Sequence, residues 1–313
     1  MSGTIGIYPS TVMAADMPYS YSSLESDITE ILNLVAKGLK SDNDLCCISH
    51  DASVKVDGFK IMKQRDILQS QEYAFFIGDD RISENIVSSK DRLSDIADCV
   101  TGINCGDNKR FLALEESNQR KINGYPSIGE QEIDIFHTSI EPVELPKRYI
   151  PIIKGSSSTA YFRTADKWII EWTASALHHY TNDKKARFQN SSYYFKKGIA
   201  LPMEKSSKIK ATLMNKHVFD QSIVGIFPHD EKYILYLLAF LNSQIANDCI
   251  HMINPTANNS ANYLKKLPIY IPTQSELSEV NKWVTLIIEN KSTDTYQELI
   301  DVFFHNKMYK KAA

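Results

Sequence analysis

The sequence predicts an α+β protein, in which a small α/β segment comes first and a curled, β-rich middle region packs against C-terminal helices. Two observations lead to this class. Runs rich in β-branched and aromatic residues, such as Tyr149–Ile153 and Lys167–Trp172, recur in the middle of the chain between turn residues. From Tyr233 onward, apolar residues recur at the three- and four-residue steps of a helical stripe. We therefore divide the chain into residues 1–90, 91–230 and 231–313.

Composition bounds the class of protein. With 313 residues, 43% of them hydrophobic and 23% charged, the chain can bury one large core or two smaller ones. Its longest apolar run is far too short for a membrane span, and its first ten residues do not have the pattern of a signal peptide. The five cysteines form no CxxC or CxxxH spacing, which argues against a disulfide framework or a zinc site. We expect a cytoplasmic protein with no membrane partner.

Charge is strongly segregated along the chain. The formal net charge is only -3, yet residues 147–216 contain 14 lysines and arginines against 4 aspartates and glutamates. The regions before and after this basic block carry an excess of acidic residues. A basic block between acidic flanks favours a surface that faces a polyanion. The alternative is a lysine-rich surface that is merely solvated.

The N-terminal segment is predicted to contain a strand, a helix and a hairpin. Residues 4–12 read as a short strand that ends at Pro9, and the capping box at residues 22–25 starts a helix with an apolar stripe. The loosely alternating run that begins at Leu45 is typical of two paired strands. Asp57–Gly58 is the expected turn between them.

A tight loop, TGINCGDNKRF, follows residues 93–100, which have helical or edge-strand spacing. The loop contains neither GxGxxG nor GxxxxGK[ST], so it is not a nucleotide-phosphate fingerprint. Its two glycines and Asp–Asn pair predict a turn that exposes backbone amides beside Lys109 and Arg110. Such a loop grips a phosphate or simply connects two strands, and the residues alone do not separate these alternatives.

The second half of the basic block interleaves cations with aromatic rings. Cations neutralise phosphates and aromatic rings stack on bases or sugars, so the pattern favours nucleic-acid binding. The alternative is that the rings belong to the core of strands, which we expect for about half of them because strands alternate faces. The candidate DNA-binding residues of this block are Lys184, Lys185, Arg187, Tyr193, Lys196 and Lys197.

Two further segments lead toward the C-terminal helices. Residues 115–145 are acidic and rich in turn residues, which is typical of ordinary surface. Residues 208–214 and 223–227 are predicted as two antiparallel strands.

The C-terminal region is predicted as one helix, an asparagine-rich loop and two scaffold helices. The first helix begins near Tyr233, and its single buried stripe continues to Ile245. Pro255 stops any helix, and the polar tract at residues 256–262 has no packing reason to be so rich in asparagine. The scaffold helices are expected at residues 273–289 and 295–304.

No enzyme site stands out in the sequence. It contains no Ser/Cys–His–acid signature, no HExxH and no paired carboxylates with a nearby lysine of the kind found in nucleases. His50 and Asp51 are neighbours, but such a pair usually decorates a surface. His178 and His179 are adjacent, and adjacent residues of a strand point to opposite faces. We therefore predict no catalytic and no metal-binding residue.

Three blocks of the sequence, in order, resemble one family. LSDIADCVTGINCGDNKRFL, YIPIIKGSSSTAYF and LLAFLNSQIANDCIHMINPTANNSANYLKKLPI are similar to successive motifs of TaqI-like C-terminal specificity domains, the target-recognition domains of adenine-N6 DNA methyltransferases. The last two blocks are closest to the methyltransferases of BREX-type phage-defence systems and to fused restriction–modification enzymes. The resemblance covers about residues 92–272. The chain departs from the family pattern at Cys105, where threonine is usual, and at Ser157, where aspartate is usual.

The resemblance implies double-stranded DNA as the ligand and a methyltransferase domain or subunit as the partner. The chain has neither the [DNS]-P-P-[YFW] motif nor a glycine-rich S-adenosylmethionine motif. It therefore implies recognition without methyl transfer, with S-adenosylmethionine in the parent or partner and no cofactor in this chain. Polar side chains would read base edges, cations would hold phosphates, and the asparagine-rich loop would grip or brace. Beyond the six candidates above, the residues expected at the DNA are Lys109, Arg110, Lys154, Ser156, Ser157, Arg163, Asn258, Asn259 and Lys265.

Two of these residues carry a sharper expectation. We expect Lys154 and Arg163 to be exposed, so that alanine at either position weakens DNA binding and leaves thermal stability nearly unchanged. Two other functions stay open beside DNA recognition. One is a specificity-like or inhibitory subunit that docks on a methyltransferase or nuclease, and the other is a nuclease that needs a divalent metal.

Overall fold

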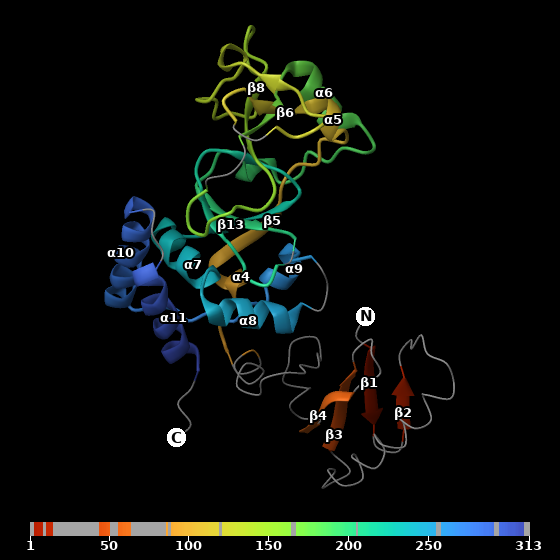
Figure 1. Cartoon of the computed structure of the whole chain (residues 1–313), viewed down its shortest axis with the longest axis vertical. Helices are drawn as coiled ribbons and strands as arrows, with labels where there is room; N and C mark the ends of the chain where they lie inside the picture. Colours follow the sequence, from red (N-terminus) through yellow and green to blue (C-terminus); the bar gives the residue numbers. More distant parts are fainter. Residues whose placement is uncertain are drawn as a thin grey trace. The chain divides into compact units, whose positions relative to one another are not determined.

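A computed structural model describes residues 3–8, 11–14, 44–50, 56–63, 86, 89–118, 121–163, 167–204, 206–254, 258–290 and 294–309. The chain divides into two compact units, residues 1–88 and 89–313. Helices and antiparallel strands both contribute, and the predicted α+β class is confirmed (Figure 1). No helix of the described residues is long and apolar enough to cross a membrane.

The N-terminal unit contains a four-stranded antiparallel sheet of order β2-β1-β3-β4. The predicted Asp57–Gly58 turn is wrong, because both residues lie inside β4, where Gly58 pairs with Ser49. A turn there would forfeit the ladder at the start of β4, so pairing overrides the local turn signal. The predicted helix at residues 22–39 falls outside the described residues. The four strands are β1 (Gly3–Tyr8), β2 (Thr11–Ala14), β3 (Asp44–His50) and β4 (Val56–Lys63).

A second four-stranded sheet lies at the centre of the C-terminal unit, and its order is β11-β10-β13-β5. The strands are β5 (Ala97–Thr101), β10 (Gly198–Pro202), β11 (Thr212–Met214) and β13 (Ile223–Pro228). β11 and β13 do not pair with each other as predicted, because β10 lies between them and is antiparallel to both. The intervening residues Val218–Phe219 form β12 of the other sheet.

The third sheet has five strands in the order β12-β8-β9-β6-β7. β8 (Tyr149–Ile153) and β9 (Trp168–Glu171) form where the β-rich runs predict them, and they pair antiparallel. The remaining strands are β6 (Leu112–Glu115) and β7 (Ser127–Ile128). Two helices accompany this sheet, α5 (Asn108–Phe111) and α6 (Ala174–Asn182). His178 and His179 therefore lie on a helix and not on a strand, because Thr173 caps α6 through Ala176 N.

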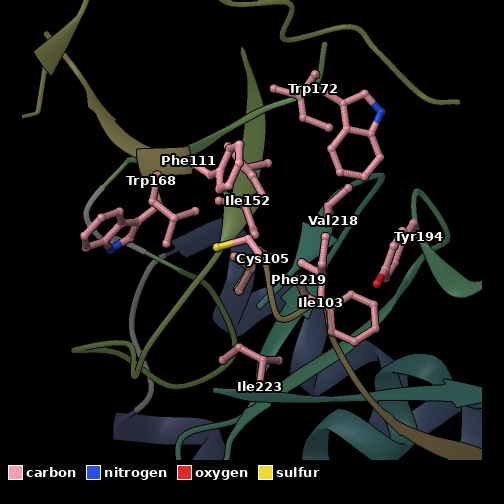
Figure 2. Close-up of a cluster of buried hydrophobic side chains, with 14 of the residues drawn as sticks. Ile103, Cys105, Phe111, Ile152, Trp168, Trp172, Tyr194, Val218, Phe219 and Ile223 are labelled. Carbon is pink, nitrogen blue, oxygen red and sulfur yellow. The ribbon is translucent and has the colours of Figure 1, made fainter. Parts of the chain in front are cut away.

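The two sheets of the C-terminal unit share one hydrophobic core. Figure 2 shows Trp172, Tyr194 and Phe219 converging in it, and Phe111 and Ile223 belong to the same cluster. The rings of Tyr194 and Phe219 meet edge to face, with centroids 5.6 Å apart. Aromatic residues from the basic block thus serve as core, as the alternative interpretation of that block proposed.

Gly102 is the point where the chain leaves β5 and crosses to the other sheet. A Cβ on Gly102 would lie 1.9 Å from the carbonyl oxygen of Phe219, so no other residue fits. Ile103 N then donates to Phe219 O at 2.9 Å, and Gln221 N donates to Ile103 O at 2.8 Å. The glycine of the TG dipeptide therefore permits a backbone crossing and marks no ligand.

The helical part differs from the predicted single helix. α7 (Ile234–Leu241) ends at Asn242, and Ser243 caps a separate helix, α8 (Gln244–Ile253), by accepting from Ala246 N. Leu235 keeps partial exposure while the rest of α7 is buried, so there is no single stripe. The reason is that α7 contacts β10 and β13 on one side and the long helix α10 (Gln274–Asn290) on the other.

The two scaffold helices form as predicted. α10 begins at a capping box in which Thr273 N donates to Glu276 Oε2 at 2.8 Å and Glu276 N donates to Thr273 Oγ1 at 3.4 Å. α11 (Asp294–Met308) places Lys307 beside the same carboxyl group, and this ion pair lowers the pKa of Glu276 to about 2. Because its carboxyl is ionised, Glu276 ties the two helices together.

Asn242 links the helices to the edge of the central sheet. Its Oδ1 accepts from Ala211 N at 2.9 Å, and its Nδ2 donates to Ala211 O and Leu238 O, both at 2.9 Å. Asn247 binds the preceding part of the same segment: its Oδ1 accepts from Ile209 N and its Nδ2 donates to Ser207 O, both at 3.1 Å. The two carboxamides are buried and replace a neighbouring strand along residues 207–211.

Tyr161 also pairs with this segment, and its N–H shares Ala211 O with Asn242 Nδ2. Tyr161 N donates to Ala211 O at 2.8 Å, and Leu213 N donates to Tyr161 O at 2.9 Å. The Tyr161 hydroxyl donates to Gln297 Oε1 at 2.7 Å, and Gln297 Nε2 donates to Asn242 O at 3.1 Å. Strand edge, helix break and α11 are therefore joined in one buried hydrogen-bond network.

Replacing Asn242 with alanine tests this network. Asn242→Ala leaves the buried Ala211 N–H without its acceptor and should lower the free energy of unfolding by about 2–3 kcal/mol in chemical denaturation. The matched control is Asn262→Ala, an exposed asparagine in the short helix at residues 261–264, which should change stability by less than about 0.5 kcal/mol. Equal stability of the two variants would contradict the role given to Asn242.

Candidate nucleic-acid interface

Two of the predicted DNA-binding segments lie side by side. Asn104 N donates to Arg187 O at 3.1 Å, and Arg187 N donates to Asn104 O at 2.7 Å. Farther along, Gln189 Nε2 donates to Gly102 O and Asn190 Nδ2 donates to Thr101 O, both at 2.9 Å. The segment from the end of β5 into α5 and the loop after α6 thus form one surface, which we call the paired-loop surface (residues 101–110 and 183–190).

The GDN turn of this surface is shaped by packing and capping. Gly106 has φ +82°, and a Cβ there would lie 3.1 Å from Ala186 N and 3.2 Å from His179 Nε2. Asp107 Oδ1 accepts from Lys109 N and Arg110 N at 3.1 and 3.2 Å. Those two amides are therefore occupied by Asp107 and are not exposed to a ligand, which favours the alternative in which the loop connects two strands.

Cys105 occupies the position where the resembled family usually has threonine. Its thiol donates to Asn108 Oδ1 at 3.1 Å, so a donor is present in this turn. Burial raises the pKa of Cys105 to about 11 and that of Cys99 to about 12, which keeps both thiols protonated and weakly nucleophilic at neutral pH.

The paired-loop surface carries exposed cations. Lys109 Nζ lies 4.6 Å from the centroid of the Tyr125 ring and donates to Asn123 O at 3.3 Å. The Arg110 guanidinium lies 4.7 Å from the Phe111 ring centroid. Within the part of the chain that the structure describes, no ion pair engages the other cations of this surface, which are Lys184, Lys185 and Arg187.

Lys154 and Arg163 are not free surface residues, so the expectation that they are exposed is wrong. Lys154 Nζ pairs with Asp220 Oδ1 at 3.0 Å, and the Asp220 side chain is only 3% exposed. Arg163 Nη2 donates to the carbonyl oxygens of Lys154 and Gly155, the latter at 2.9 Å. The physical reason is a partner distant in sequence, since a buried carboxylate requires a compensating cation.

The two candidate serines after β8 differ in exposure. Ser156 is exposed, whereas Ser157 is buried and its Oγ accepts from Thr159 N at 3.3 Å. Ser157 is therefore part of the local turn and is not placed to reach a base edge, in contrast to its prediction.

Of the candidates near Tyr193, the tyrosine has internal partners, whereas the two lysines are exposed. The Tyr193 hydroxyl donates to Asp98 Oδ2 at 2.8 Å, and this hydrogen bond raises its pKa. Its ring packs 4.9 Å from Phe227, so it is not a free stacking platform. Lys196 lies over the same ring at 5.2 Å, and both Lys196 and Lys197 are exposed.

The asparagine-rich loop makes bracing contacts. Asn254 Nδ2 donates to Asn258 O at 2.9 Å and to Asn259 Oδ1 at 3.2 Å, and Asn259 N donates to Met203 O at 2.6 Å beyond β10. Asn259 is buried, while Asn258 is exposed. The side chains of Asn254 and Asn259 therefore have a packing role, because each is buried and is hydrogen-bonded to the other.

The loop continues into α9 (Ala261–Leu264), which returns the chain to the start of the unit. Lys265 is exposed, and its carbonyl accepts from Ser94 N at 3.3 Å. Leu93 N, at the start of α4 (Leu93–Ile96), donates to Leu267 O at 2.9 Å. Loop and helix therefore connect the end of β10 to α4.

A second exposed feature was missed in the sequence. Ile135, Phe136, Ile140 and Leu145 are exposed, Phe136 to 84% and Leu145 to 80%, although residues 115–145 read as ordinary surface. The loop holds its shape, since Phe136 N donates to Asp134 Oδ1 at 3.0 Å and Val143 N donates to Trp172 O at 2.9 Å. The signal was present: residues 130–146 contain five acidic residues and no lysine or arginine around these apolar side chains.

Neither known families nor metal chemistry identify the site. Among the described residues, no group of three or more His, Cys, Asp and Glu side chains is arranged to hold a metal ion. A scan against models of protein families found no match to the chain. A search of curated proteins found none either.

Lys154 and Lys184 form a matched pair for a stability test. Lys154→Ala leaves the Asp220 carboxylate buried without its cation and should lower the free energy of unfolding by about 2–4 kcal/mol. Lys184→Ala removes an exposed, unpaired cation and should change it by less than about 0.5 kcal/mol. Chemical denaturation measures both free energies of unfolding. A Lys154→Ala protein as stable as Lys184→Ala would contradict the structural role of the Lys154–Asp220 ion pair.

Proposed function

We propose that this chain is the sequence-specific DNA-recognition module of an adenine-N6 DNA methyltransferase or of a fused restriction–modification enzyme. In this proposal the chain is not an enzyme on its own. S-adenosylmethionine and the catalytic motifs belong to another domain or to a partner subunit, and the complex works in the cytoplasm on double-stranded DNA. The observation that carries the proposal is the paired-loop surface with its unpaired, exposed cations.

The physical case rests on what those cations can do. A lysine or arginine without an internal partner is available to neutralise a phosphate and release its counterion. Lys184, Lys185 and Arg187 lie within four residues of each other, on a loop whose backbone is hydrogen-bonded to residues 101–104. A fixed backbone under mobile charges loses little entropy when it binds.

The family resemblance supports the same proposal. Its first block contributes α4, β5 and the GDN turn, its second contributes β8, and its third contributes α7, α8 and α9. All three blocks fall within one compact unit, residues 89–313. A methyltransferase partner follows from the resemblance and from the missing catalytic motifs.

A second candidate function is a subunit that docks on a methyltransferase or nuclease. The exposed loop with Phe136 and Leu145 favours it, because large apolar side chains in a held loop are typical of protein interfaces. Its acidic surroundings repel DNA and suit a basic partner. The two functions are compatible, since the paired-loop surface and this loop are separate sets of residues.

Salt dependence of DNA binding distinguishes them. The logarithm of the association constant for a random-sequence duplex should fall linearly with the logarithm of salt concentration, with a slope of about 0.9 per phosphate contacted. The double variant Lys184→Ala/Lys185→Ala should therefore reduce the magnitude of the slope by about 2. Lys282→Ala, which removes an exposed cation of α10, should leave it unchanged.

Fluorescence anisotropy over a salt series measures these slopes. Wild-type protein that shows no salt-dependent retention of the duplex would overturn DNA recognition and leave protein docking as the function.

A further inference from the structure

Arg187 differs from its neighbours in how it is held. Residues 186–190 run alongside residues 101–106, and four of the five use their side chains internally. Ala186 is buried, with its backbone beside Gly106, and Phe188 packs 5.9 Å from Trp172 and 5.7 Å from Tyr194. Gln189 and Asn190 donate to backbone carbonyls of the opposite loop. The exception is Arg187, whose side chain is exposed.

The backbone of Arg187 is fixed on both sides. Its N–H donates to Asn104 O at 2.7 Å and its carbonyl accepts from Asn104 N at 3.1 Å. Asn104 is itself fixed, because its Oδ1 accepts from Gly106 N at 2.9 Å. The flanking side chains of Ala186 and Phe188 point into the protein, and alternation along an extended segment therefore directs Arg187 outward.

A guanidinium on a fixed base is suited to one kind of ligand. It presents several N–H donors in a planar fork, which matches two acceptors side by side. The O6 and N7 atoms of guanine offer such a pair in the major groove of DNA. A lysine ammonium acts as a point charge and suits a phosphate. Lys184 and Lys185 both have exposed side chains, on a turn where Lys185 N donates to Asp183 Oδ1 at 2.8 Å.

We propose that Arg187 reads a guanine base in double-stranded DNA by a bidentate contact to O6 and N7, while Lys184 and Lys185 hold adjacent phosphates. This inference rests on the proposed function and deepens it by assigning base readout to one residue. It also removes Gln189 and Asn190 from readout, although both are residue types that commonly contact bases, because their amides are engaged with Gly102 and Thr101.

Selection from a randomised duplex library tests the assignment with the full chain. The wild-type protein should enrich a motif that contains a required guanine. Arg187→Ala should lose the preference at that position by about 5- to 150-fold, the range expected for one bidentate contact, and keep the preferences elsewhere. Arg187→Lys retains the charge but should weaken the preference measurably, because its ammonium lacks the planar fork.

The controls separate readout from charge. Lys184→Ala should weaken binding to all library members to a similar degree and leave the motif intact, whereas Lys282→Ala should change neither. Should Arg187→Ala fail to fold, Arg187→Lys carries the test alone. An unchanged motif in Arg187→Lys or Arg187→Ala would overturn guanine readout by Arg187 while leaving DNA recognition in place. A wild-type protein that enriches nothing and does not bind duplex DNA would overturn both.

Discussion

The C-terminal unit depends on one buried carboxamide. Asn242 satisfies both backbone groups of Ala211 and, through Gln297, joins the network of Tyr161. A buried peptide group without partners destabilises a fold by about 1–3 kcal/mol, so the short edge of the central sheet requires these side chains. This gives the Asn–Ser that ends α7 two structural tasks: Asn242 supports a strand edge, and Ser243 starts the next helix.

The same principle operates at the paired-loop surface. The loops at residues 101–106 and 186–190 are not regular strands, yet backbone and amide hydrogen bonds tie them together at three successive points. Gly102 allows the first loop to cross Phe219, and Gly106 allows it to approach Ala186. Internal partners thus occupy most polar groups of this region, and the exposed cations are what remains for a ligand. The presence of a cation therefore does not by itself indicate a ligand-binding residue here. An exposed cation without an internal partner is the better indicator.

Local patterns in the sequence predicted those elements whose signals are local. β8 and β9 follow from β-branched runs, and α10 follows from the Thr273–Glu276 capping box. Errors arose where distant partners decide. Lys154 was predicted as a surface cation because its partner, Asp220, lies 66 residues away in the sequence. The helix break at Asn242 was missed because the apolar spacing continues across it to Ile245, while Asn242 is bound to Ala211, 31 residues away.

The candidate site was partly predictable for the same reason. The cations at 184–187 were identified from composition, but their distinction from Lys154 and Arg163 required the ion pairs and hydrogen bonds of the folded chain. The exposed apolar loop near Phe136 was overlooked because acidic, turn-rich composition usually indicates plain surface. Burial and exposure of single side chains depend on tertiary packing, and no local pattern fixes them.

We propose that unpaired cations of the paired-loop surface face DNA, while the paired cations stabilise the fold. Lysine acetylation footprinting by mass spectrometry tests it directly, with the full chain free and saturated with duplex DNA. Lys184 and Lys185 should react readily in the free protein and lose reactivity with DNA, while Lys282 should react equally in both states. Lys184 and Lys185 that keep full reactivity in a DNA-saturated sample would contradict the claim.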